Sequence, residues 1–480
     1  MDLRNRKLSE DEFFKERQEV LAQWSTGKDV DLDEAIVFHK SLPSHKVCVP
    51  LLKQAKANGE SYAITGMGKA TIEEQIDLLT YIEREGQANY LGTTVDSFSR
   101  QNNYQEAEKG IAESIKKGRS TLNGFPLVNH GVSGFRRVIE AVQSPISMRY
   151  GAADPRLIDE IGYAGGHTAG AEDALMDFWH HHSRVALETV IMTHRYAHRL
   201  IGYYEEHGVP ICASCQGLYG AGIPPSLPMA AILVQVLMMA EQGVKHIRYH
   251  IATHGHLAQD VATANVLRKL AQEYLTRFGY HDIEDFLSVS FSLVQYPLEP
   301  GSAFAVVFMN TLMAHLCGAQ ANDIRTVAEA KGIPTKEDTA YTFRTAKVME
   351  NFLKTQKISI DHHGLEAESR MVEQEVRCIV DKVLEFGDGD VIMGTIRAIK
   401  AGVLDNPFAT NPTSPCKVMG IKDKDGAVRY LNHGNLPFTD DILAFHKDKI
   451  LEREKKRGKK LDYDTLVNDL LAVSRGVLVE

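Results

Sequence analysis

The stretch VKHIRYHIATHGHLAQDVATANVLRKLAQEY, residues 244–274, contains the pattern that decides the fold. A short apolar-rich run, His246–Ile251, ends in the sequence THG at 253–255 and is followed by an amphipathic stretch, Gln259–Tyr274. The short run predicts a buried strand and the longer stretch a helix, so that together they form one strand–loop–helix unit. A glycine and polar side chains at the carboxyl end of such a strand are typical of loops that carry functional residues.

Units of this kind repeat along the chain from about residue 60, which predicts a parallel sheet with helices packed against it. The other clear helical patterns are Ile72–Glu85, Glu106–Lys117 and Arg184–Glu206. The candidate strands are Tyr62–Thr65, Tyr90–Thr94, Pro126–Val128, Ile146–Arg149, His167–Ala169, Pro210–Ala213, His246–Ile251, Leu287–Val294 and Asp323–Arg325. A barrel of this class has eight strands, so one of these nine is wrong, and we suspect Tyr90–Thr94 or the segment at His167.

The two ends of the chain differ from this repeating part. Near the N-terminus, charged helical patterns cover Glu10–Gln23 and Asp31–Leu42. From Gly387 onward the chain has glycine turns, an irregular proline-rich stretch and a basic helix, His446–Lys460. The expected fold class is therefore α/β, a (β/α)8 TIM-type barrel with N-terminal helical and C-terminal α+β extensions. We expect an N-terminal helical extension at 1–55, the catalytic barrel at 56–385 and a C-terminal extension at 386–480.

Composition and charge argue against several classes of protein. The chain has 480 residues, 44% of them hydrophobic, which suits a large globular protein. A net charge of −9 spread over both signs argues against a nucleic-acid or membrane-surface protein. The longest apolar run, Pro228–Met239, is too short to span a membrane, and the charged N-terminal sequence does not resemble a signal peptide. Six cysteines are too sparse for a disulfide framework, so we expect a cytoplasmic protein with reduced thiols.

Two arginines stand at the ends of predicted strands or in the loops that follow them, Arg100 in FSRQNNY and Arg149 in SMRYG. A guanidinium group is a planar fork that matches the geometry of a carboxylate. Two such groups at the mouth of a barrel indicate a small carboxylate or dicarboxylate substrate. From spacing alone, structural salt bridges explain the two arginines equally well.

Two groups of histidines raise the question of a metal. His180, His181 and His182 are consecutive, so their side chains point to different faces and cannot all bind one ion without an irregular backbone. His250, His254 and His256 share one strand parity, which makes a divalent-metal site geometrically possible. These three would suit a metal-dependent barrel hydrolase or lyase. Polar residues around a barrel mouth are the simpler interpretation.

Several longer stretches resemble the large subunit of glutamate mutase, also called the methylaspartate mutase epsilon chain. They are YLGTTVDSFSRQNNY (90–104), GRSTLNGFPLVNHGV (118–132), GIPTKE (332–337), GTIRAIKAGVLDNPF (394–408) and VRYLNHGNLPFT (428–439). Their spacing holds with almost no gaps, so the resemblance covers nearly the whole chain.

The resemblance implies an isomerase, the catalytic large subunit of an adenosylcobalamin-dependent carbon-skeleton mutase. Enzymes of this family carry out a radical 1,2-rearrangement of a small carboxylate or amino acid, of the glutamate/3-methylaspartate type. Their cobalt is ligated by a histidine of a separate small cobalamin-binding subunit, which has a D-x-H-x-x-G motif. This chain contains no such domain, so the resemblance implies that it binds no metal itself, needs that partner, and forms a homodimer within a heterotetramer.

The resemblance assigns seven positions to the cofactor: Gly68, Asn123, His180, Tyr296, Arg325, Glu329 and Ile333. Three of them differ from the family, because Arg325 replaces a lysine, Tyr296 a phenylalanine and His180 a proline. A carboxylate such as Glu329 can accept hydrogen bonds from both hydroxyls of a ribose.

The substrate side departs further from the family. The family holds its substrate with three arginines, of which Arg100 and Arg149 match two, whereas the third position is Gly66. The family's glutamate that accepts a hydrogen bond from the substrate ammonium aligns with Ala171, and Glu172 follows directly. The positions we assign to the substrate are Arg100, Arg149, Tyr150, His167, Glu172, Asp177 and His181, with Tyr150 replacing a family histidine and Asp177 and His181 replacing family tyrosines.

Two explanations compete for these departures. In the first, the substrate has changed and needs one fewer carboxylate clamp. In the second, Glu172 takes over the role of the missing carboxylate and the glutamate reaction is intact. A buried carboxylate left without its arginine is strongly disfavoured, and Asp177 nearby would add repulsion, so we favour a changed substrate within the same reaction class. A non-catalytic family member is a third possibility.

Overall fold

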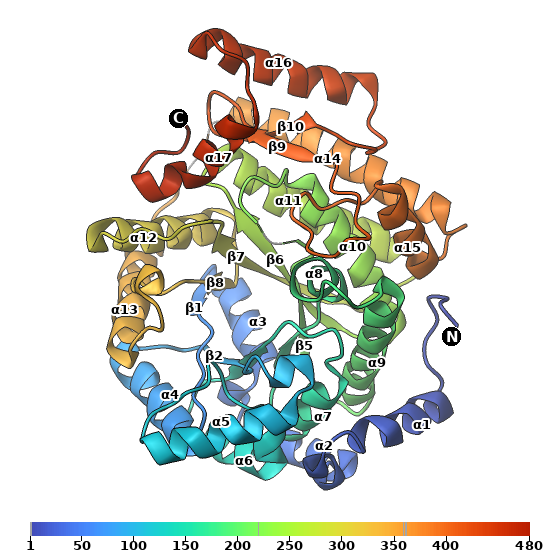
Figure 1. Cartoon of the computed structure of the whole chain (residues 1–480), viewed down its shortest axis with the longest axis vertical. Coiled ribbons are helices and arrows are strands. Elements are labelled where there is room, and N and C mark those ends of the chain that lie inside the picture. The colour runs from blue at the N-terminus through green and yellow to red at the C-terminus, as the bar shows by residue number, and fades with distance from the viewer. Residues whose placement is uncertain (1, 219, 359, 361) are drawn as a thin grey trace.

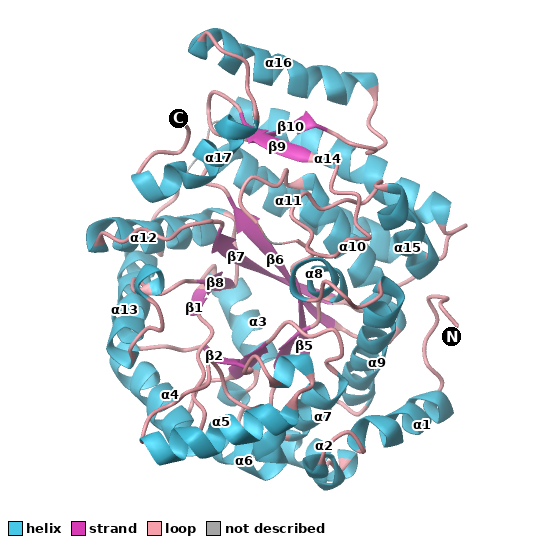
Figure 2. Ribbon diagram, in the orientation of Figure 1, coloured by secondary structure: helices cyan, strands magenta, loops and turns pink. Residues whose placement is uncertain are grey.

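The computed structural model describes residues 2–218, 220–358, 360 and 362–480. Its centre is one sheet of eight parallel strands surrounded by helices (Figures 1 and 2). The strands are β1 (Tyr62–Ile64), β2 (Leu91–Thr94), β3 (Ile146–Arg149), β4 (Ala169–Ala171), β5 (Cys212–Cys215), β6 (His246–Thr253), β7 (Glu284–Phe291) and β8 (Ala321–Asp323).

Hydrogen bonds bring the two edges of this sheet together. The strands follow the order β1-β8-β7-β6-β5-β4-β3-β2, and Met67, just past β1, forms a parallel bridge with Thr93 of β2. The Met67 amide donates to the Gly92 carbonyl at 3.2 Å, and the Thr94 amide donates to the Met67 carbonyl at 2.8 Å. We followed the paired residues from Thr94 of β2 through β3 and the other strands to β8 and β1. The path returns to the chain of β2 at Gly86, eight residues before Thr94. That shift is the shear of a (β/α)8 barrel, so the predicted fold class is confirmed.

Eight of the nine predicted strands overlap an observed strand, and the wrong one is Pro126–Val128. Residues 127–128 belong to the first turn of α6 (Leu127–Ala141), in which Gly131 leaves the helical geometry at φ 67°. The suspicion about Tyr90–Thr94 and the segment at His167 was therefore misplaced, since they contain β2 and lead into β4. A few apolar residues after a proline suit the first turn of a helix as well as a short strand, so periodicity could not separate the two.

Helices follow the strands and form the outer ring of the barrel. They are α4 (Ile72–Gly86), α5 (Tyr104–Lys117), α6, α7 (Arg156–Ala164), α9 (Leu187–Glu206), α10 (Ser226–Glu241), α11 (Leu257–Arg277), α12 (Pro300–Leu316) and α13 (Lys336–Leu353). The single turn α8 (Ala174–Met176) lies inside this ring, at the carboxyl ends of the strands. The apolar helix α10 is almost entirely buried, because α14 (His362–Phe386) and α15 (Val391–Ala401) cover its outer side. None of the helices in the described ranges is both long enough and apolar enough to cross a membrane.

The helix α3 (Cys48–Asn58) closes the amino-terminal end of the barrel. Its residues Cys48, Val49 and Leu52 form one apolar cluster with side chains at the starts of the strands, among them Tyr90 and Cys212. Figure 2 shows α3 behind the strands. The barrel interior is therefore sealed with apolar groups below and opens toward the carboxyl ends of the strands. The predicted boundary at residue 55 falls inside this helix.

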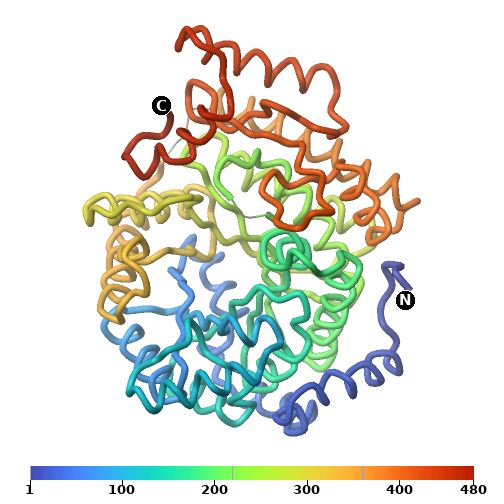
Figure 3. Tube along the Cα trace, viewed as in Figure 1, coloured from blue at the N-terminus to red at the C-terminus, as the bar shows by residue number. Residues whose placement is uncertain are grey.

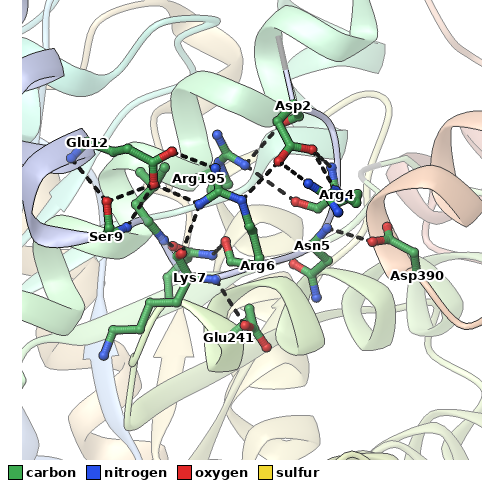
Figure 4. A network of polar contacts seen from close by, with 12 residues as sticks. Asp2, Arg4, Asn5, Arg6, Lys7, Ser9, Glu12, Arg195, Glu241 and Asp390 are labelled. Carbon is green, nitrogen blue, oxygen red and sulfur yellow. Dashed lines mark hydrogen bonds and ion pairs between the residues drawn. The ribbon is translucent and has the colours of Figure 1, made fainter.

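The N-terminal segment is fastened to the outside of the barrel by polar contacts (Figure 4). The Asn5 amide donates to Asp390 at 2.8 Å, and the Lys7 amide donates to Glu241 of α10 at 3.0 Å. Asp2 pairs with Arg6 at 2.9 Å. Beyond this segment lie α1 (Glu10–Leu21) and α2 (Leu32–Ser41).

The C-terminal part packs over the side of the barrel formed by α10 and α11 (Figure 3). Its elements are β9 (Met419–Lys422), β10 (Val428–Asn432), α16 (Asp440–Arg457) and α17 (Tyr463–Ala472). Arg429 of β10 is buried and pairs with Asp423 at 2.8 Å and with Glu368 of α14. These charge pairs fasten the β9–β10 hairpin to the helices around the barrel.

Candidate active site

A cavity of about 310 Å³ lies at the carboxyl ends of the strands. A deeper pocket of about 90 Å³ continues it into the barrel, and Arg149, Tyr150, His250 and Asp323 line both. These residues come from or directly follow β3, β6 and β8, so several strands converge on one site. Enzymes with this fold carry their catalytic groups at this end of the barrel.

Arg149, the last residue of β3, forms an ion pair across the barrel with Asp323, the last residue of β8. The same carboxylate lies 3.7 Å from Nδ1 of His250. Nε2 of His250 contacts the Ser290 hydroxyl at 2.8 Å. Burial, together with the nearby arginine charges, lowers the pKa of His250 to about 4, so this ring is neutral at physiological pH.

Arg100 reaches the same cavity from the short 3₁₀ helix η3 (Ser99–Gln101), which follows β2. Asp96 stabilises this turn, because its carboxylate accepts hydrogen bonds from the amides of Phe98 and Ser99 at 2.9 and 3.2 Å. Burial lowers the pKa of the Arg100 guanidinium. Within the described part of the chain its Nε has no hydrogen-bond partner. A guanidinium that lines a cavity and whose Nε has no partner is available to bind a carboxylate.

Glu172 lies one layer behind the cavity rather than in its wall. Tyr163 donates a hydrogen bond to it at 2.6 Å, and the Tyr150 hydroxyl lies 3.2 Å away. Tyr150 donates its shorter hydrogen bond, 2.6 Å, to Asp159, which is also completely buried. Burial raises the pKa of Glu172 to about 7 and that of Asp159 well above its usual range. Glu172 is thus connected to the cavity through Tyr150.

Asp177 and His181 stand on a single π-helical turn, η4 (Asp177–His181), an irregularity common at functional sites. Asp177 is 2.7 Å from Nδ1 of His181 and 3.3 Å from Nε2 of the buried His194. Burial opposes its ionisation, but the hydrogen bonds from these two rings lower the pKa of Asp177. Asp177 lines the deeper pocket, and His181 lines the outer cavity.

His180 and His167 point elsewhere. His180 turns away from His181 and contacts Asn406 at 3.0 Å. His167, near the amino end of β4, stacks on Phe135 with ring centroids 4.1 Å apart and does not line the cavity. Burial lowers the pKa of His167 to about 3.

Of the other positions assigned to the cofactor, Arg325 and Glu329 line the outer cavity and pair with each other at 2.8 Å. Ile333 projects into solvent with 80% of its surface exposed. Asn123 accepts a hydrogen bond from the Ser97 amide at 3.1 Å, and the buried Tyr296 hydroxyl lies 3.3 Å from the Ala303 carbonyl.

Gly68 has a steric role in this region. A Cβ atom there would lie 2.5 Å from the Gly124 Cα, so the glycine lets the loop after β1 approach the segment between α5 and α6 closely.

Comparison with known sequences identifies the family. The sequence profile of the methylaspartate mutase E chain family matches residues 42–480. The glutamate mutase epsilon subunit of Treponema denticola is 41% identical to this chain, over 100% of it and 99% of the relative. That of Desulfitobacterium hafniense is 39% identical with the same coverage. The chain belongs to the methylaspartate mutase E chain family. It is therefore an isomerase of the methylaspartate mutase type, and the resemblance seen in the sequence is confirmed.

The three histidines of the metal-dependent alternative do not converge in this member of the methylaspartate mutase E chain family. His250 faces the cavity, His254 lies against Asp260 at 4.0 Å, and His256 caps α11 by accepting from the Gln259 amide. Among the described residues, no three His, Cys, Asp or Glu side chains form a group that could hold a metal ion. The geometry therefore gives no support to a metal-dependent hydrolase or lyase at these positions.

Three charged residues that line the cavity or its deeper pocket were not predicted as site residues from the sequence: Asp173, Asp323 and Arg248. Asp323 was predicted as part of a strand, without a functional role. Arg248 lines the deeper pocket from the middle of β6. One signal could have found it, because His246, Arg248 and His250 alternate on a strand whose surroundings were predicted to be buried. A charged side chain inside a buried strand needs a partner or a ligand.

Proposed function

We propose that this chain is the catalytic large subunit of an adenosylcobalamin-dependent carbon-skeleton mutase that rearranges a small carboxylate or amino acid. The observation that supports this most directly is the pair Arg100 and Arg149, which face one cavity that is sealed below by α3. Family membership supplies the reaction class, and the two arginines supply a site for an acid.

In this proposal the substrate carboxylate binds between Arg100 and Arg149. The substrate carboxylate either binds Arg149 together with Asp323 or displaces the Asp323 carboxylate from Arg149. His250 beside them is neutral, so it can donate or accept a hydrogen bond without adding charge. His194, whose pKa Asp177 raises, and His181 both contact the Asp177 carboxylate, which reduces its repulsion of an incoming acid.

The residues of the outer rim suit the proposed cofactor. Glu329 offers a carboxylate to ribose hydroxyls at the cavity mouth, and Arg325 orients it. The exposed Ile333 offers apolar surface to a group or subunit that covers the mouth. Adenosylcobalamin, when bound, supplies the radical chemistry that removes and returns a substrate hydrogen. The protein's part is to orient the substrate and, with α3 sealing the barrel floor, to keep water from the reacting carbons.

We further propose that the partner is a small cobalamin-binding subunit with a D-x-H-x-x-G motif, and that a homodimer of this chain forms the core of a heterotetramer. The relatives are named epsilon subunits, which implies an assembly with at least one other subunit. The Gly66 position supports a substrate that differs from glutamate. Gly66 lines the cavity where the family has its third arginine, and a Cβ there would lie 3.3 Å from the Arg149 side chain.

The test combines the full chain, a cobalamin-binding subunit, adenosylcobalamin and a panel of small acids that includes glutamate and 3-methylaspartate. We expect at least one acid to give a rearranged product by NMR and a substrate-dependent paramagnetic signal. An Arg137→Met variant is the matched control for loss of an arginine from the cavity, such as Arg149→Met. Arg137 is an exposed arginine that pairs with Glu73 and does not line the cavity. If the whole panel gives neither product nor signal, the proposal fails and a non-catalytic family member is favoured.

A further inference from the structure

Arg248 places a positive charge on the floor of the cavity. It belongs to β6, is 4% exposed, and lines the deeper pocket together with Arg149 and Ser214. One Nη atom donates to the Tyr90 hydroxyl, and Nε donates to the Ser214 hydroxyl at 3.4 Å. Both partners are neutral groups, because burial raises the pKa of Tyr90 well above its usual range.

The other arginines that are at most 4% exposed have carboxylate partners, whereas Arg195, which is 9% exposed, donates to two backbone carbonyls. Arg199 pairs with Glu206 at 2.7 Å, Arg429 with Asp423 at 2.8 Å, and Arg453 with Asp469 at 2.6 Å. For Arg248, no carboxylate of the described residues lies within ion-pair distance, 4.0 Å. A buried guanidinium without an anion is costly unless a ligand supplies one.

Besides Tyr90, the ionisable groups that act on Arg248 are the thiols of Cys212 and Cys48 and, more weakly, the carboxylate of Asp323. Cys48 of α3 contacts the Tyr90 hydroxyl at 3.0 Å, so Tyr90 lies between the thiol and the guanidinium. Burial opposes ionisation of this thiol, whereas Cys212 and the Arg248 charge lower its pKa. Cys48 is therefore the competing counter-anion that a test has to exclude.

The register of the barrel places Arg248 below the arginines of the mouth. Arg149, Ser214 and Arg248 stand at the same position in the strand register. Because the strands are staggered, residues paired in register lie closer to the amino-terminal end of the barrel on each strand from β2 to β8. Arg248 therefore lies deeper in the barrel than Arg149. A small molecule whose one end is held at Arg100 and Arg149 therefore has its other end directed toward Arg248.

We propose that Arg248 binds a second acidic group of the substrate from the floor of the cavity. It thereby replaces, at a different place, the charge that the family's arginine supplies at position 66. This inference rests on the proposed function for the first carboxylate site. The substrate class it names is a small dicarboxylate whose two acidic groups lie along the barrel axis, one at the mouth and one at the floor.

The test measures binding of the full chain to succinate, glutarate and adipate, and to the monoamide of each, by calorimetry. A monoamide keeps the size of its parent acid but has one negative charge fewer. We expect at least one dicarboxylate to bind roughly tenfold to a hundredfold more tightly than its monoamide, as a charge-assisted hydrogen bond provides. Arg248→Met should abolish this preference and leave the monoamide affinity unchanged, and Arg248→Lys should keep part of it.

Two further variants separate the explanations. Cys48→Ala should keep the preference for a dicarboxylate over its monoamide. Loss of this preference in Cys48→Ala would mean that Cys48 acts as the counter-anion of Arg248, and it would overturn the proposal. Arg149→Met should weaken acid and monoamide alike. The wild-type chain alone also decides the matter, because equal affinities for every acid and its monoamide would refute the proposal whether or not the variants fold. The assay needs no cofactor, so absence of turnover with an intact preference would refute the proposed mutase function alone.

Discussion

The inner and outer halves of the cavity differ in how their polar groups are satisfied. In the inner half, Tyr150 and Asp177 are held by buried hydrogen bonds to other residues of the chain. In the outer half, Arg325 and Glu329 pair with each other while both remain more than a third exposed, and Ile333 is almost fully in solvent. An exposed ion pair of this kind contributes little to stability. The inner half is therefore organised by the fold itself, whereas the outer half presents groups to something that covers it.

The largest effect is expected from Arg149→Met, which removes the cation that links both halves. It takes away the proposed substrate anchor and also leaves Asp323 without its ion pair. We expect kcat/KM of the assembled enzyme to fall roughly 10²–10³-fold, because the substrate carboxylate loses its charge-assisted hydrogen bonds and the largely buried Asp323 is left without its cation. Steady-state kinetics with the best acid of the panel measures this. An activity within twofold of wild type would remove Arg149 from the substrate site.

A smaller effect, confined to the outer half, is expected from Glu329→Gln. Losing the charge of an acceptor weakens hydrogen bonds to ribose hydroxyls, so about tenfold more adenosylcobalamin should be needed for half-maximal activity. Binding of glutarate to the chain should not change. Lys331→Met, in the same short helix η5 (Glu329–Lys331), is the control. Equal effects of Glu329→Gln on cofactor and acid would show that the two halves do not act separately.

For the layer behind the cavity, the raised pKa of Glu172 predicts a pH-dependent stability. Its pKa is about 7 in the folded chain and 4.5 as the ordinary value, so the folded state holds the proton more tightly. The stabilisation that the folded state gains from this tighter proton binding is fully present below about pH 4.5 and is lost as the pH rises through about 7. Glu172→Gln should therefore reduce the loss of thermal stability between pH 5 and pH 8, by about 1–3 kcal/mol.

Thermal unfolding of Glu172→Gln and wild type at the two pH values measures this difference. The exposed Glu108→Gln serves as the control. An identical pH dependence in wild type and Glu172→Gln would mean that Glu172 does not carry the proton.

The smallest functional effect is expected from His167→Phe. This ring stacks on Phe135 outside the cavity, so kcat/KM should stay within about twofold of wild type. Stability should change with pH instead. Because burial lowers the pKa of His167 to about 3, its contribution to stability is lost as the pH falls below about 6.5, and the variant should lack this loss. A large fall in turnover would restore His167 to the substrate site.

Much of the fold could be predicted from local sequence patterns, whereas less of the active site could be predicted in this way. Alternating strand and helix patterns predicted the barrel, and Pro126–Val128 failed because a helix start and a short strand look alike over so few residues. Arg100 and Arg149 were predicted at the mouth, and both line the cavity. Glu172 lies behind Tyr150, a difference of depth that adjacency in sequence cannot reveal.

The sequence by itself determined the order of strands and helices, the family, and the presence of arginines at strand ends, because each depends on residues close together in the chain. Only the tertiary structure decided which charges meet. Arg149 and Asp323 are 174 residues apart and become neighbours because the barrel closes. Arg248 acquires its significance in the same way, since α3 seals the floor beneath it and the strand register sets its depth. Contacts across a closed barrel follow from register and closure, which no local periodicity encodes.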